Sequence, residues 1–141
     1  MEYKVDKKDL ETCFKFAVEY HLDKTKLSLN RITGQYRGLG GIIDSFIVGK
    51  IIEIGVASIL EKYSHKKLEL DFSIRGLTKE NVSDPDIIKV IERNVERDPN
   101  LFVEIKNISE WDRWIGLTTE QFLTILKNKN VPEDIVFLSL I

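Results

Sequence analysis

Two short stretches, Asp84-Pro85-Asp86-Ile87-Ile88 and Leu101-Phe102-Val103-Glu104-Ile105-Lys106-Asn107, decide the fold that we expect. The second alternates in the way typical of a strand, whose successive side chains point to opposite faces of a sheet. Glu104 and Lys106 therefore share one face, and the other face is apolar. Asp86 begins a further apolar run, which we expect on a neighbouring strand beside Glu104. Two carboxylates and a lysine at a strand end form a candidate site for a hard divalent cation and an activated water.

The composition indicates one domain without membrane-spanning character. The chain has 141 residues, of which 43% are hydrophobic, enough for a core. It contains no apolar stretch of about 18 residues, so we expect no membrane span. The charged N-terminus lacks the apolar segment of a signal peptide, and a single cysteine cannot form an internal disulfide. These features favour a reducing, cytoplasmic setting. Cys13 lies in a helical apolar pattern, which predicts a buried structural thiol.

Two helices are expected before the first strand, over residues 6–21 and 44–63, where apolar residues recur at helical spacing. Glu53 lies on the apolar stripe of the second helix, where an acid is costly unless something pairs with it. We therefore prefer Glu53 as a functional acid to Glu61, which lies nearer the helix end; the alternative is a surface acid at the margin of the stripe. Its neighbours on the stripe are Phe46, Gly49, Val56, Ala57 and Leu60.

The segment between these helices is rich in glycine, and no acid occurs from Lys24 to Ile43. A local basic stretch can supply phosphate contacts even in a chain with a net charge of −2. We predict an arm that contacts the DNA backbone, and the alternative is a loop that only joins two helices. The proposed DNA-binding residues are Arg31, Gln35, Tyr36 and Arg37.

The rest of the chain predicts mostly strands. Alternation over residues 66–74 indicates a half-exposed strand, and a second strand is expected from Asp84 to Glu92. Residues 95–100 are polar and are predicted as a loop, and a helix after Thr118 and a final strand from Ile135 follow. Asp71 and Asp84 are rivals of Asp86 for the role of the site aspartate.

Pro85-Asp86, a spacer and then Glu104-Ile105-Lys106 resemble the signature of the PD-(D/E)XK nuclease superfamily. That superfamily includes most type II restriction endonucleases and Holliday-junction resolvases. The resemblance covers about residues 44–141. It implies an α/β fold with a restriction-endonuclease-like αβββαβ core, in which helices flank a mixed central β-sheet. Residues 1–43 would add an N-terminal helix and the Gly-rich arm to the same single domain.

The resemblance also implies a chemistry. Asp86, Glu104 and the backbone carbonyl of Ile105 would hold Mg²⁺, with Mn²⁺ able to substitute. Glu53 would assist, and Lys106 would orient or deprotonate the attacking water. The implied activity is Mg²⁺-dependent hydrolysis of double-stranded DNA by a type II restriction endonuclease, with a homodimer expected at a two-fold target. The alternatives are a structure-specific nuclease such as a junction resolvase, and a non-catalytic DNA-binding or assembly module of the same fold.

Overall fold

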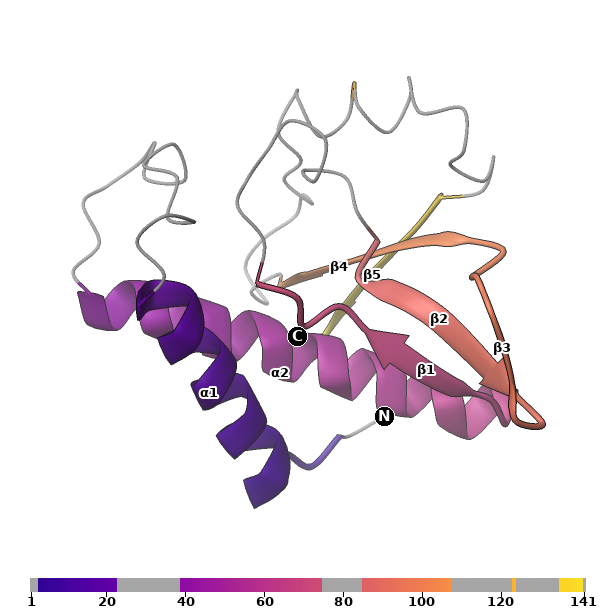
Figure 1. The fold of residues 1–141 in the computed structure, drawn as a ribbon, viewed down its shortest axis with the longest axis horizontal. Coiled ribbons are helices and arrows are strands. Elements are labelled where there is room, and N and C mark those ends of the chain that lie inside the picture. The colour runs from indigo at the N-terminus through magenta and orange to yellow at the C-terminus, as the bar shows by residue number, and fades with distance from the viewer. Residues whose placement is uncertain (1–2, 23–38, 75–84, 108–122, 124–134, 141) are drawn as a thin grey trace.

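A computed structural model describes residues 3–22, 39–74, 85–107, 123 and 135–140. Helix α2 runs beneath the strands, and α1 packs across it near one end (Figure 1). The protein has a mixed α/β fold, as the sequence predicts. The elements in chain order are α1 (Lys7–Leu22), α2 (Leu39–Ser64), β1 (Lys67–Leu70), β2 (Ile87–Glu92), β3 (Val95–Arg97), β4 (Phe102–Asn107) and β5 (Ile135–Leu140).

Helix α1 begins at a side-chain cap and buries one face against α2. The Asp6 carboxylate accepts a hydrogen bond of 2.8 Å from the backbone N–H of Asp9, which satisfies a donor that the first turn leaves open. Cys13 on the buried face is fully enclosed. Burial, with smaller effects from Asp9 and Glu53, raises the pKa of its thiol to about 11. The prediction of a structural thiol is confirmed.

Helix α2 is longer than predicted. It begins at Leu39 instead of the predicted residue 44, so Gly40 and Gly41 belong to the helix. The helix is apolar on nearly all sides, which suits its contacts with α1, β1, β4 and β5. It ends where His65 takes a left-handed conformation (φ 54°) and donates its N–H to the Glu61 carbonyl at 2.9 Å. Neither of the described helices is both long and apolar enough to cross a membrane.

The described strands form two hydrogen-bonded sheets, where a single mixed sheet was expected. Strands β1, β2 and β3 pair antiparallel in that order, and β4 pairs parallel with β5. The sheets meet where the N–H of Asp86 donates to the Val103 carbonyl at 3.0 Å. A parallel pair requires a crossover connection. The helix that we predict there falls in residues 108–134, of which the structure describes only residue 123. Strand β1 ends at Leu70, short of the predicted residue 74, beside an irregularity in its register with β2.

The main hydrophobic core lies between α2 and the strands. It joins Val56 of α2 to Ile87, Val103 and Ile105 of β2 and β4. Partly buried residues of α2 and β1 pack against this group. The core therefore holds the start of β2 and the middle of β4 against the same stretch of helix, which is where the candidate site residues lie.

The loop predicted over residues 95–100 is wrong in its first half, because Val95–Arg97 forms β3 and pairs with β2. Residues 98–100 lie outside any helix or strand, as predicted. Arg93 and Asn94 connect the two strands with φ angles of 52° and 65°. Two positive φ angles at the centre of a two-residue connection are typical of a type I′ turn, whose twist suits a hairpin. The usual Asn-Gly or Asp-Gly signal is absent from the sequence, so the hairpin was not predicted.

We expect the turn to respond to backbone conformation. Asn94→Gly should be more stable than Asn94→Ala by about 1 kcal/mol, because a Cβ is disfavoured at positive φ. Urea midpoints at an unchanged denaturant slope measure the difference. The same pair of changes at Lys62, an exposed position within α2, is the control and should show the reverse order. If alanine were the more stable replacement at position 94 as well as at position 62, the result would contradict the turn.

Candidate active site

Strand β4 places Glu104 and Lys106 on one face, as the alternation predicts, and the two side chains form an ion pair. The place of Glu104 near a strand end also predicts an exposed acid, and this prediction is wrong. Glu104 is only 7% exposed. Residues 102–105 of β4 are all buried, so both faces of this part of the strand are covered.

Asp86, directly before β2, is held by its neighbours on both sides. Its N–H donates to the Val103 carbonyl and its carbonyl accepts from the N–H of Asp71, each at 3.0 Å. Its side-chain Oδ2 accepts a hydrogen bond of 2.5 Å from the backbone N–H of Ile105. The Asp86 carboxylate thus lies against the backbone of β4 at the residue between Glu104 and Lys106.

Glu53 comes to the same region from α2 and is buried. Its Oε2 lies 2.6 Å from the Nζ of Lys50, one helical turn earlier. The alternative acid, Glu61, has a structural role instead. Its Oε1 accepts a hydrogen bond of 2.7 Å from the N–H of Leu68, which links β1 to the helix. The choice of Glu53 over Glu61 as the functional acid stays a prediction.

The carboxylates of this region act on one another's charge. Burial is the main cause that raises the pKa of Asp86, to about 7, and Glu53 and Glu104 add to the effect. Burial also raises the pKa of Glu53, although the ammonium of Lys50 opposes the shift. Three buried or half-buried carboxylates face two ammonium groups, those of Lys50 and Lys106. The carboxylates are those of Glu53, Asp86 and Glu104, and together with the two lysines they are called the cluster below. With every group ionised, the cluster carries one surplus negative charge.

The chemistry of this donor set suits a hard divalent cation. Carboxylate oxygens are the preferred ligands of Mg²⁺, and a cation would neutralise the surplus charge. Glu53, Asp86, Glu104 and the carbonyl of Ile105 are the groups that would hold it. In the arrangement described, Glu53 and Glu104 each hold a lysine ammonium. Over residues 3–22, 39–74, 85–107, 123 and 135–140, no three acidic, histidine or cysteine side chains converge as a ready metal-binding group.

The remaining predicted residues do not join this cluster. Asp71, a rival of Asp86, turns its Oδ1 toward Ser73, accepting from the N–H at 2.9 Å and from the hydroxyl at 2.5 Å. Asp84, the other rival, lies outside the described residues. The four predicted DNA-binding residues, Arg31, Gln35, Tyr36 and Arg37, also lie outside them.

Sequence reasoning missed Lys50. The signal was present, since Lys50 precedes Glu53 by three residues and a spacing of three or four places helical side chains side by side. A cation at that spacing can pair with an acid on an apolar stripe and offset the cost of burying it.

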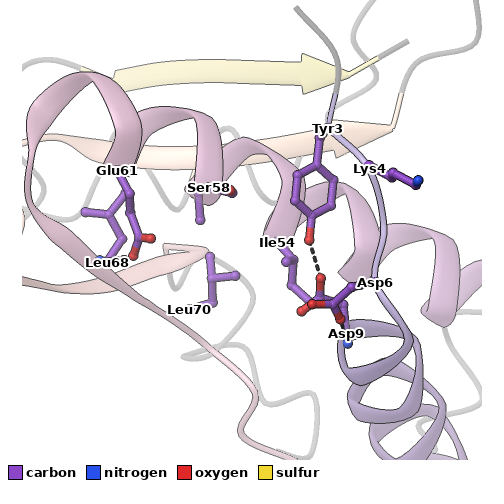
Figure 2. Close-up of a pocket in the computed structure, with 10 residues that line it drawn as sticks. Tyr3, Lys4, Asp6, Asp9, Ile54, Ser58, Glu61, Leu68 and Leu70 are labelled. Carbon is purple, nitrogen blue, oxygen red and sulfur yellow. Dashed lines mark hydrogen bonds between the residues drawn. The ribbon is translucent and has the colours of Figure 1, made fainter.

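Two hollows in the described surface lie away from the cluster. One of about 390 Å³ opens between the N-terminal segment, α2 and β1, where Tyr3 points its hydroxyl at Asp9 and donates a hydrogen bond to it (Figure 2). The other, of about 450 Å³, is mostly apolar and lies beside the end of α2, β2 and β4. None of the four predicted catalytic side chains lines either hollow.

Comparison of the chain with protein-family models, curated proteins and solved structures finds no match. The function is therefore inferred from the residues of the cluster themselves.

The raised pKa of Asp86 predicts how stability depends on pH. Between its ordinary pKa of 3.8 and the folded value of about 7, the folded protein binds a proton that the unfolded chain releases. In the presence of EDTA, the free energy of unfolding should therefore fall as pH rises from about 4 to 7, by on the order of 3–4 kcal/mol from this residue. Asp86→Asn should flatten the slope. Urea unfolding at several pH values measures it.

The same substitution at the exposed Asp98, which is not part of the cluster, is the control and should keep the parent's slope. A slope that Asp86→Asn leaves unchanged would contradict the shared burial of these carboxylates.

Proposed function

We propose that the protein is a metal-dependent endonuclease that hydrolyses DNA phosphodiester bonds, of the type II restriction class, on a PD-(D/E)XK-like core. The observation that carries the proposal is geometric: the Asp86 carboxylate accepts from the N–H of Ile105, between the ion-paired Glu104 and Lys106. Glu53 is buried on α2 and raises the pKa of Asp86. The order of elements supports it as well, because a long helix, antiparallel strands, a strand with Glu-x-Lys and a parallel partner follow in turn.

The exposure of the side chains indicates which of them would hold the metal and which would meet the substrate. Asp86, Glu104 and the Ile105 carbonyl would hold Mg²⁺, and Glu53 would assist. The bound cation would supply positive charge beside the scissile phosphate. The Lys106 side chain is 28% exposed and that of Glu104 is 9% exposed, so the ammonium is the group better able to meet water and substrate. There it would orient the attacking water and stabilise negative charge that develops on the phosphate oxygens.

The proposal includes double-stranded DNA as substrate, a cytoplasmic setting and a homodimer that matches a two-fold target. Contacts to the DNA backbone would come from Arg31, Gln35, Tyr36 and Arg37, which are free of neighbouring acids in the sequence.

The test is incubation of the protein with plasmid, cruciform and unmethylated genomic DNA, with Mg²⁺ and separately with EDTA. Discrete fragments that require Mg²⁺ are the expected result. Cutting of the cruciform alone would replace the restriction class by a junction resolvase. Binding without cutting of any substrate would overturn the nuclease and leave a DNA-binding or assembly module.

Glu104→Gln should lower the cleavage rate by at least about 100-fold, because the loss of one preorganised charged group at a reacting phosphate has effects of this size. Glutamine keeps the shape of the buried side chain, whereas alanine would leave a gap beside Lys106. Initial rates on plasmid measure the loss, and circular dichroism checks the fold. Glu69→Gln, at an exposed acid of β1, is the control and should cut like the parent. Parental activity in the Glu104 variant would remove Glu104 from the reaction.

A further inference from the structure

Lys50 is a nearly buried lysine whose ammonium is contacted from three parts of the chain. Its Nζ lies 2.6 Å from Glu53 Oε2 and 2.6 Å from the carbonyl oxygen of Asp71. The same atom lies 5.1 Å from the ring centroids of Phe16 in α1 and Phe72 beyond β1. The side chain is 12% exposed. The lysine is thus held by two oxygens and by two aromatic rings, which attract a cation.

The pair does not resemble the surface ion pairs of the same protein. Lys89 and Glu96, for example, lie 3.1 Å apart with side chains 42% and 59% exposed. An exposed pair adds little stability, and a buried pair often adds less than apolar residues of similar size would. Apolar side chains at both positions 50 and 53 would fill the same space without burying a charge. Stability alone therefore does not account for the pair.

We propose that Lys50 is a positioning residue that fixes the Glu53 carboxylate for the candidate cation site, and that Phe16 and Phe72 hold its ammonium in place. The inference rests on the proposed function. By holding Oε2, Lys50 sets the direction of the Glu53 carboxylate. Groups that orient a metal-binding carboxylate through hydrogen bonds change metal affinity by about 10–100-fold when they are removed.

Helix α1 gains a role from this arrangement. Phe16 stacks edge-on against Phe72 with ring centroids 5.6 Å apart, and the ammonium lies against both rings. The N-terminal helix, which is an addition to the core that the resemblance implies, therefore completes the surroundings of a residue at the site.

The test titrates Mn²⁺ alone into the full chain and follows the free ion by electron paramagnetic resonance. Lys50→Met should weaken Mn²⁺ binding by about 10–100-fold. Methionine keeps the packing between the rings. Lys50→Arg keeps the charge and should recover part of the loss. In a Glu53→Gln background, Lys50→Met should have little further effect, because the carboxylate that it positions is gone. Lys89→Met is the matched surface control and should bind like the parent.

Unchanged or tighter Mn²⁺ binding by Lys50→Met overturns the inference, since tighter binding would make Lys50 a competitor of the cation. An equal loss in the Glu53→Gln background overturns it too, because the lysine would then act on the fold in general. If Lys50→Met does not fold, Lys50→Gln replaces it, since an amide can still donate to the Asp71 carbonyl. A parent protein that neither binds Mn²⁺ nor cuts DNA overturns the proposed function. If the parent does both, the result for Lys50→Met tests the role of Lys50 alone.

Discussion

The hydrogen bonds of Asp86 join the two sheets of the protein. Its N–H reaches β4 at Val103, its carbonyl accepts from Asp71 beyond β1, and its carboxylate accepts from Ile105. Because both strands also pack on α2 through the apolar core, this junction brings the start of β2, the middle of β4 and one stretch of helix together. The acids of the cluster come from these three elements, so their proximity follows from how the sheets are joined.

The cluster is costly for the fold. Glu53 lies one helical turn from Val56, and Glu104 lies between Val103 and Ile105, all of them buried. Apolar residues at positions 53 and 104 would fill the same space without a desolvation cost. The two lysines offset part of that cost, but the raised pKa of Asp86 and of Glu53 shows that the surroundings still disfavour their charge. Perturbed acids grouped in this way are more frequent at functional sites than in ordinary cores.

Sequence patterns predicted what depends on local periodicity. Strand alternation predicted that Glu104 and Lys106 share one face of β4, and helical spacing predicted that Glu53 lies among apolar residues. The burial of Glu104 could not be predicted, because alternation defines two faces of β4 and does not say that both are covered. The rings around Lys50 come from segments far apart in sequence. The turn at Arg93 and Asn94 was missed because left-handed residues other than glycine carry a weak signal.

The two lysines of the cluster differ in what can reach them. Lys50 is enclosed by rings and oxygens, whereas the Lys106 side chain is 28% exposed and bound to a single carboxylate, Glu104, among the described ion pairs. Under the proposed function, a substrate phosphate would compete with Glu104 for the ammonium of Lys106. The carboxylate so released would become available to a cation, and a cation on Glu104 would in turn leave Lys106 to the phosphate. Because such coupling is reciprocal, DNA and the divalent cation would each strengthen the binding of the other.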